Sequence, residues 1–291
     1  MNQNRLSAPR LFINLGFILV SLACVLPLLL VLSVSLTSES SVAANGYRFF
    51  PGEFSLGAYR YIFSGASPLP RAYLVTLFVT GAGTLLHLWI TSMLAYGLSR
   101  REVRYAAPIS FLVVFCLLFN GGLVPWYILI QRYLHLKDTV WALIVPYLVS
   151  SVNVLIMRNF FRSVPDSIIE SARIDGAGEF TTFVRLVVPL SKPVFATIGL
   201  FVAVFFWNDW FTCALFIETG KLYTLQFLLQ SIMNNLQYLQ GRELGAKIIG
   251  NLPSETARMA ACILAIGPII LAYPFLQRFF VQGLTLGAVK Q

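Results

Sequence analysis

Four consecutive residues, Trp207-Asn208-Asp209-Trp210, place two indole rings, an amide and a carboxylate side by side within a long apolar segment. Indole faces pack on the apolar faces of sugar rings, and the amide and the carboxylate can hydrogen-bond hydroxyl groups. A carboxylate inside a membrane costs roughly 2.5–3.5 kcal/mol on insertion scales, so Asp209 should have a specific reason to be there. This quartet is a candidate for ligand contact, with helix packing or gating as the alternative.

Two further polar sites interrupt apolar segments. Asn120-Gly121-Gly122, followed by Pro125, should break a helix and expose backbone groups, which is tolerated only against protein or a water-filled cavity. Asn153 lies in another apolar segment. We therefore expect Asn120 and Asn153, with the quartet at 207–210, to be candidates for lining a pathway through a membrane.

Residue types and spacing argue against other chemistry. His87 and His135 have no sequence neighbours that suggest a metal site. The cysteines form no CxxC pair and are expected to pack as small apolar residues; they are Cys24, Cys116, Cys213 and Cys262. The sequence has no GxxxxGK[ST], GxSxG or HExxH motif, so we expect no metal, no cofactor and no catalytic constellation in this chain. Any energy source must then come from another polypeptide.

The composition is typical of a membrane protein. Hydrophobic residues make up 57% of the 291 residues and charged residues only 11%, whereas about a quarter of residues are charged in soluble domains. Since about 20 apolar residues cross the hydrocarbon core, spans can be found as gaps between charges. Six gaps, broken only by Asp209, are long enough: 11–38, 72–99, 105–131, 139–157, 193–217 and 259–277. We predict an all-α polytopic membrane protein with six transmembrane helices.

The same charges set the orientation. The apolar run Leu11–Leu36 is too long for the centre of a signal peptide and is expected to remain as an uncleaved helix. The short turn with Arg100, Arg101 and Arg104 is expected in the cytoplasm, because short loops weigh most in the positive-inside rule. Both termini and the polar loop 158–192 then lie in the cytoplasm. The net charge of +9 is scattered over both sides of the membrane, which argues against nucleic-acid binding.

The polar loop has a helical pattern of its own. Pro165 suits a first helical turn, with Ser163 available as a cap. That helix can run to Asp175, where Gly176 allows a left-handed stop. A second short helix is expected from Glu179 to about residue 187, ending at Pro189. The product is a helix–Gly–helix projection that either docks into a partner or lies on anionic lipid, and the physics alone favours neither.

The spacing in this loop resembles the EAA loop of ABC importer permeases, which reads Glu-Ala-Ala, three residues, Gly, nine residues, Ile-x-Leu-Pro. Here Glu170-Ser171-Ala172, Gly176 and Leu186-x-Val188-Pro189 stand in register, with Ser171, Leu186 and Val188 as the departures. Other stretches are similar to the carbohydrate-importer branch, including the maltose-type inner permease and its oligosaccharide and polysaccharide relatives; they are FNGGLVPWYILIQRYLHLKDTVWALIVP, RNFFRSVPDSIIESARIDGA, PLSKPVFATIGLFVAVFFWNDW and YPFLQRFFVQGLTLGAVK. The resemblance covers most of the chain from residue 71 and extends to the smaller permease of alginate-type importers.

The resemblance implies a type I ABC importer permease fold with a cytoplasmic coupling helix. Residues 1–70 would hold the first transmembrane helix and an outer loop, residues 71–282 five core helices with the coupling loop at about 158–192, and residues 283–291 a cytoplasmic tail. The residues implied in coupling to a partner ATPase are Glu170, Ser171, Ala172, Asp175, Gly176 and Pro189. The tail, GLTLGAVKQ, is similar to one that reaches between ATPase subunits.

The resemblance also implies partners. These are a second homologous permease subunit, a cytoplasmic ABC ATPase dimer that binds ATP and Mg²⁺, a periplasmic or extracellular solute-binding protein, and a saccharide substrate. The implied location is the bacterial inner (cytoplasmic) membrane. The outer segments 37–71 and 218–258 would meet the solute-binding protein. Aromatic residues of the first segment would help there or would form a belt at the membrane surface; they are Tyr47, Phe49, Phe50 and Tyr59.

Two other functions stay open. A permease for another solute class, such as amino acids or phosphate, would share the EAA loop, but the WNDW and AVK segments argue against it. A proton-coupled secondary transporter would give Asp209 a role as proton carrier but would leave the EAA loop unexplained. A polyanion such as alginate would be repelled by Asp209, which favours a structural role for this residue.

Overall fold

The computed structural model describes residues 8–63, 68–100, 102–240 and 255–288; it leaves out the side chains of residues 8–12, 235–240 and, Pro274 apart, 272–288. In these ranges the chain is helical, with one isolated antiparallel bridge between Thr37 and Phe54. It divides into two compact units: unit 1 is residues 1–70 with 231–268, and unit 2 is residues 71–230 with 269–291. The prediction of an all-α protein is confirmed.

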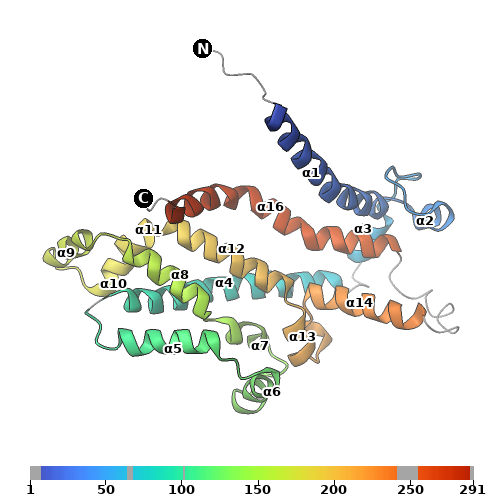
Figure 1. Ribbon diagram of the computed structural model, residues 1–291. Helices are drawn as coiled ribbons and strands as arrows, with labels where there is room; N and C mark the ends of the chain where they lie inside the picture. Colours follow the sequence, from blue (N-terminus) through green and yellow to red (C-terminus); the bar gives the residue numbers. More distant parts are fainter. Residues whose placement is uncertain (1–7, 64–67, 101, 241–254, 289–291) are drawn as a thin grey trace. The chain divides into compact units, whose positions relative to one another are not determined.

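Unit 2 contains the polar loop and all the pathway candidates (Figure 1). Its elements begin with α4 (Leu69–Ser99), α5 (Ala106–Leu118), α6 (Leu123–Ile128), the π-helix η1 (Leu129–Tyr133), α7 (Trp141–Ile144), the 3₁₀ turn η2 (Val145–Tyr147) and α8 (Ser151–Arg162). They continue with α9 (Asp166–Ile174), α10 (Glu179–Thr182), the π-helix η3 (Phe183–Val187), α11 (Val188–Leu190), α12 (Lys192–Asn208), α13 (Phe211–Phe216), η4 (Gly220–Leu222) and the start of α14 (Leu225–Gln240).

Unit 1 contains α1 (Ala8–Ser35), α2 (Glu39–Asn45), α3 (Gly57–Phe63) and the first part of α16 (Glu255–Ala288). The Glu39 carboxylate accepts hydrogen bonds from the backbone N–H groups of Glu255 (3.0 Å) and Thr256 (3.1 Å). These N–H groups open α16 and have no partner within the helix, so Glu39 caps it. Of the four outer aromatic residues, Tyr47, Phe49 and Phe50 are exposed, while the Tyr59 hydroxyl lies 3.0 Å from Ser35 Oγ.

The predicted spans are only partly continuous. Among the described residues, two helices are long and apolar enough to cross a membrane: Ile13–Ser35 within α1, and α4. Three helix pairs pass the same test together but are bent, by 116° between α5 and α6–η1, by 50° between α7–η2 and α8, and by 81° between α10–α11 and α12. The sixth predicted span, 259–277, falls within α16, which runs without a break to Ala288. The break within 105–131 was expected from the sequence, whereas the bend within 139–157 was not.

The first two breaks coincide with residues that interrupt a helix. The first was expected at Asn120–Pro125 and is confirmed: Gly122 has a φ of 85°, in the left-handed region that favours glycine, and α6 starts after it. The second follows Pro146, which has no backbone N–H to donate to a helix. Within the predicted span 193–217, the long helix α12 ends at Asn208, and the short helix α13 begins after residues 209–210.

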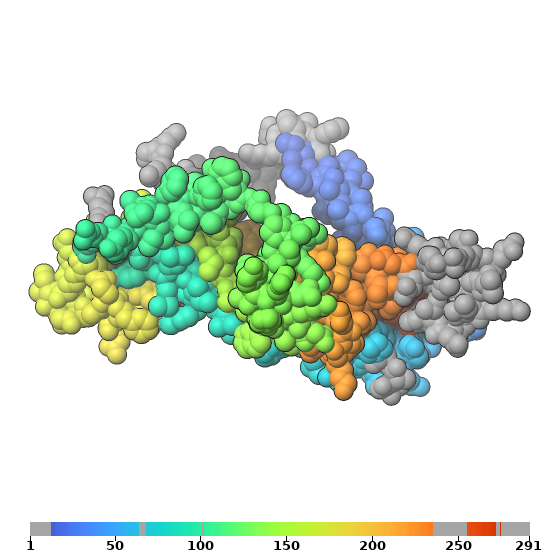
Figure 2. Space-filling model, turned by 90° about the horizontal axis from the view of Figure 1, so that it is seen from below, coloured from blue at the N-terminus to red at the C-terminus, as the bar shows by residue number. Residues whose placement is uncertain are grey.

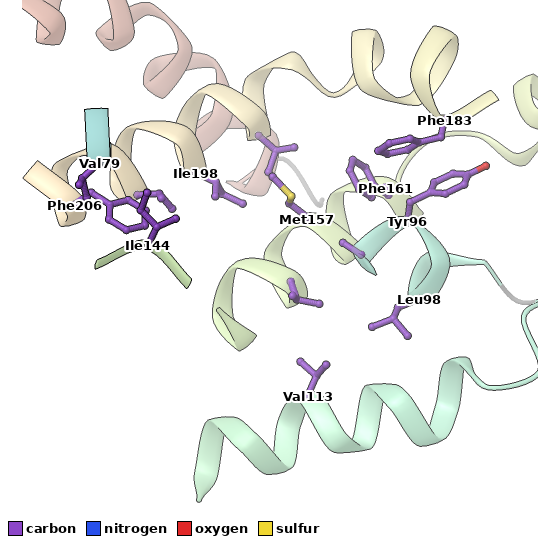
Figure 3. Close-up of a cluster of buried hydrophobic side chains, with 14 of the residues drawn as sticks. Val79, Tyr96, Leu98, Val113, Ile144, Met157, Phe161, Phe183, Ile198 and Phe206 are labelled. Atoms are coloured by element: carbon purple, nitrogen blue, oxygen red, sulfur yellow. The ribbon is translucent and has the colours of Figure 1, made fainter. Parts of the chain in front are cut away.

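The core of unit 2 is a cluster of aliphatic and aromatic side chains from α4, α5, α8, η3 and α12 (Figure 3). Gly83 of α4 lets α12 come close, because a Cβ at this position would lie 2.7 Å from the Phe206 ring. Small residues that allow helix backbones to approach are typical of membrane helix interfaces. At one end of the cluster, the rings of Tyr96, Phe161 and Phe183 gather where the polar loop joins the bundle (Figure 3).

Candidate functional site

The first candidate site is the polar loop, whose segment α9–α10 lies at one end of unit 2 (Figure 1) and is drawn in yellow in Figure 2, where it forms a projection. As predicted, Pro165 directly precedes the helix, since α9 begins at Asp166. The predicted Ser163 cap is wrong, because Ser163 Oγ donates back to the Phe160 carbonyl (2.6 Å) and α9 has no side-chain cap. A hydroxyl three residues beyond a carbonyl can bond backwards, which removes it from the following helix.

The end of α9 is the predicted left-handed stop. Gly176 has a φ of 81°, its N–H donates to the Arg173 carbonyl (3.0 Å), and the Ala177 N–H donates to the Ala172 carbonyl (2.9 Å). These two hydrogen bonds form a Schellman motif, which satisfies carbonyls that the last turn of a helix leaves open. Nothing lies within 4 Å of a Cβ placed on Gly176, so the backbone conformation alone, and not space, requires glycine.

The residues implied in coupling share one short projection. Glu170, Ser171 and Asp175 are exposed on α9, and Ser171 Oγ donates to the Ser167 carbonyl (2.9 Å). Ala172 is buried together with Ile169 on the opposite side of the helix. This arrangement leaves a polar face free and attaches α9 to the bundle through a small apolar contact.

The second half of the loop is one helical segment that starts at Glu179, as predicted. It runs from α10 through η3 and α11 to Leu190, one residue beyond the predicted end at Pro189, which is exposed. Pro189 lies one residue before the end of this segment, so its missing N–H affects only the last turn. Phe183 and Val187 are buried, so η3 attaches the loop to the core.

Sequence reasoning passed over the charged residues that face this loop. Arg173, at the end of α9, contacts Glu102 in the turn after α4 and Glu179 at the start of α10. A pocket of about 240 Å³ lies beside these residues, lined in part by Arg100, Arg162 and Asp166. The RREVR turn and the polar loop each contain basic and acidic residues, which was the signal that the sequence offered. The two stretches lie 71 residues apart at Glu102 and Arg173, so the sequence does not show that they meet.

The second candidate site is the WNDW quartet, whose four side chains have different surroundings. Trp207 is buried and packs edge-on against Tyr73, with ring centroids 5.7 Å apart. Asn208 is exposed and donates from Nδ2 to the Val204 carbonyl (2.8 Å), and Trp210 is exposed. Asp209 Oδ1 accepts from the Thr212 N–H (3.1 Å), so this carboxylate caps the start of α13. The structure thus gives Asp209 a local structural contact.

A hydrogen-bonded chain joins Asn153 to this region. Asn153 Nδ2 lies 2.9 Å from His87 Nε2, and His87 Nδ1 lies 2.7 Å from the Tyr147 carbonyl oxygen. The Tyr147 hydroxyl lies 2.8 Å from Thr212 Oγ1, next to the cap provided by Asp209. The sequence showed no metal-site partners for His87; the structure places its buried ring against both halves of the bent pair α7–η2 and α8.

The remaining pathway candidate, Asn120, is separate from this chain. Its Oδ1 accepts from the Gly122 N–H (2.9 Å) and supports the turn between α5 and α6.

A second turn that sequence reasoning missed lies at Asp138, which has a φ of 58° and accepts from the backbone N–H groups of Glu218 (3.0 Å) and Thr219 (2.8 Å). These hydrogen bonds lower the pKa of Asp138, the Thr219 hydroxyl contributing most.

No group of three or more His, Cys, Asp or Glu side chains is placed to hold a metal ion within the described ranges. The four cysteines are all free thiols; Cys213 is buried, Cys262 half-buried, and Cys24 and Cys116 are exposed on helices. Only Cys213 therefore packs as fully as the sequence led us to expect.

Comparison with known proteins identifies the family. Residues 10–286 match the family described as "Binding-protein-dependent transport system inner membrane component". The polygalacturonan/rhamnogalacturonan transport system permease protein YtcP of Bacillus subtilis is 41% identical over 94% of this chain and 96% of its own length, and Protein LplC of the same organism is 38% identical over 91% and 89%.

A solved structure gives the same answer for the fold. It is described as a bacterial ABC transporter involved in the import of the acidic polysaccharide alginate, and one of its chains superposes with a TM-score of 0.82 at 27% identity, covering 96% of this chain and 99% of that one. The fold, the EAA-like loop and the family match over nearly the whole chain agree. This chain belongs to the family of inner membrane components of binding-protein-dependent transport systems.

Proposed function

We propose that this chain is one permease subunit of an ATP-driven importer of oligo- or polysaccharides that contain uronic acids. The observation that carries this proposal is the 41% identity, across nearly both full lengths, to a permease named for polygalacturonan and rhamnogalacturonan transport. The alginate importer with a TM-score of 0.82 adds a second acidic polysaccharide. Galacturonan and alginate share a pyranose ring that carries a carboxylate, so the common chemistry is a uronate chain.

The projection α9–α10 would couple this permease to an ATPase subunit. Its exposed face carries Glu170, Ser171 and Asp175, and Ile174 at its end is 85% exposed, a large apolar side chain suited to burial against a partner. ATP binding would close the ATPase dimer and move the docked projections, which would shift the permease between inward-open and outward-open states. ATP and Mg²⁺ would be bound by the ATPase, a second permease would complete the pathway, and a solute-binding protein would deliver the saccharide.

We further propose that both termini and the polar loop face the cytoplasm of a bacterial cell. The concentration of arginines at the end of α4 and in the adjoining loop supports this orientation under the positive-inside rule. Asp209 does not argue against import of a polyanion, because its contact with the Thr212 N–H gives this carboxylate a structural role.

The test is reconstitution of the complete complex in proteoliposomes with its second permease, ATPase and binding protein. We expect binding protein loaded with oligogalacturonate or oligoalginate to stimulate ATP hydrolysis and uptake, whereas neutral arabino-oligosaccharides and raffinose should not. Stimulation by the neutral sugars alone would overturn the uronate proposal. The purified chain by itself should not hydrolyse ATP, and specific turnover by it would overturn the permease proposal.

A further inference from the structure

Arg173, in the last turn of α9, bridges three segments of unit 2. Its Nη1 donates to Glu102 Oε1 (2.7 Å) and its Nη2 to Glu102 Oε2, so the pair is bidentate. Its Nε and Nη2 also donate to Glu179 Oε1, at 3.0 and 2.7 Å. One guanidinium therefore holds the end of α9, the turn after α4 and the start of α10 at fixed distances.

This bridge continues into the core. The Tyr96 hydroxyl, in the last turn of α4, donates to the other oxygen of Glu179 (2.8 Å). The Tyr96 ring packs against Phe183, with centroids 5.0 Å apart, and carries the Arg100 guanidinium 4.8 Å above its centroid. We call the set Arg173, Glu102, Glu179 and Tyr96 the Arg173 clamp.

The apolar attachment of α9 is small, which makes the clamp important for its orientation. Ile169 and Ala172 are the buried residues of this nine-residue helix, which ends at the glycine turn of Gly176. A single exposed ion pair contributes little, but bidentate arginine–carboxylate pairs within a network are the favourable exception. Two carboxylates shared by one planar guanidinium fix direction as well as distance, which a lysine ammonium does not do.

We propose that Arg173 is a positioning residue that makes α9, α10 and the end of α4 move as one body, so that movement of a docked ATPase is passed to α4. This inference rests on the proposed function. Loss of the clamp should leave docking and ATP hydrolysis in place, since the exposed residues Glu170, Ser171 and Asp175 are unchanged. It should reduce the amount of saccharide moved per ATP.

The experiment measures saccharide transported per ATP in the reconstituted complex for wild type, Arg173→Gln, Arg173→Lys and Glu102→Gln. The control is Arg185→Gln, because Arg185 is an exposed arginine of the same loop whose side chain makes no ion pair or hydrogen bond with the described residues. We expect the ratio to fall about fivefold or more in Arg173→Gln, the low end of typical coupling factors, less in Arg173→Lys, and not at all in Arg185→Gln. An unchanged ratio in both Arg173→Gln and Glu102→Gln would overturn the proposal.

A second measurement does not depend on transport. Spin labels are attached to cysteines introduced at two exposed positions, Ser167→Cys on α9 and Tyr105→Cys beside α5. In the full complex, with its native cysteines replaced by alanine, they report the distance from the projection to the turn after α4. The distance distribution should be narrow in wild type and broader in Arg173→Gln and in Glu102→Gln. Equal widths would overturn the inference, even for a variant with poor activity. If wild type itself shows no ATP-driven uptake, the proposed function fails, while the distance measurement still decides whether the clamp orders α9.

Discussion

Nε2 of His87 lies 2.9 Å from Nδ2 of Asn153, while Nδ1 of the same ring lies 2.7 Å from the carbonyl oxygen of Tyr147. A carbonyl only accepts hydrogen bonds, so Nδ1 carries the proton and Nε2 accepts from the Asn153 amide. The imidazole of α4 thus satisfies a carbonyl left open by the break between α7 and α8, and it also holds α8. Thr91, one turn further along α4, reaches the Leu148 carbonyl (3.4 Å) in the same way.

His87→Leu should therefore destabilise the protein by about 1–3 kcal/mol, because it leaves a buried carbonyl and an amide without partners. Thermal unfolding of the detergent-solubilised complex measures this change. Asn153→Leu should cost less, since it frees only one ring nitrogen, and the double variant should cost less than the sum of the two single variants. Strict additivity of the two losses would contradict a direct hydrogen bond between these residues.

Two neighbouring glycines of α4 offer a matched test of helix packing. A Cβ at Gly83 would lie 2.7 Å from the Phe206 ring of α12, whereas nothing lies within 4 Å of a Cβ at Gly81. Gly83→Ala should lower stability by about 1–3 kcal/mol through overpacking, and Gly81→Ala should be neutral or slightly stabilising. Thermal unfolding of the two variants under identical conditions checks the difference. Equal melting temperatures would mean that α4 and α12 are not packed this closely.

The glycine turn of the projection can be tested in the same paired way. Gly176 has a φ of 81° and Gly178 a φ of −71°, and a Cβ at either meets nothing within 4 Å. Gly176→Val should strain the backbone by about 1–3 kcal/mol, misdirect α9, and reduce transport per ATP or prevent assembly. Gly178→Val should support normal uptake. Normal uptake by Gly176→Val would argue against α9 as the coupling helix.

Asp209 separates the ATP-driven mechanism from a proton-coupled one. The carboxylate caps α13 by accepting from the Thr212 N–H, and an amide oxygen can accept the same hydrogen bond. Asp209→Asn should thus retain saccharide-stimulated ATP hydrolysis and uptake, while Asp209→Leu should lose the cap and about 1 kcal/mol of stability. Uptake should also survive a protonophore while ATP is present. Abolition of uptake by the protonophore at full ATP would exclude the ATP-driven mechanism.

The Arg173 clamp has a defined pH dependence. Hydrogen bonds from Arg173 hold the pKa of Glu102 below its usual value of 4.5. A carboxylate with a lowered pKa contributes above that usual value and loses its contribution only as the pH falls through the lowered pKa. The difference in transport per ATP between wild type and Arg173→Gln should therefore stay constant from about pH 6 to pH 8. If transport per ATP instead became equal in wild type and Arg173→Gln as the pH falls to 6, Glu102 would titrate within this range and would not be held by Arg173.

Sequence alone was sufficient for features that depend on local chemistry. The lengths of the apolar runs predicted a helical membrane protein, and the Gly176 stop and the break at Asn120–Pro125 follow from the φ and hydrogen-bonding properties of Gly and Pro at those positions. The spacing from Glu170 to Pro189 indicated the family, which the match over residues 10–286 establishes.

Tertiary structure decided which polar groups pair with each other. His87 and Asn153 are 66 residues apart, and Glu102 and Arg173 are 71 apart, so neither pair leaves a periodic signal in the sequence. The Tyr147 carbonyl, left open by the bend after Pro146, is likewise satisfied by a side chain 60 residues away, that of His87 on α4. Hydrogen bonds within a helix are fixed by local backbone geometry, whereas these contacts exist only because packing of the bundle brings distant segments within bonding distance.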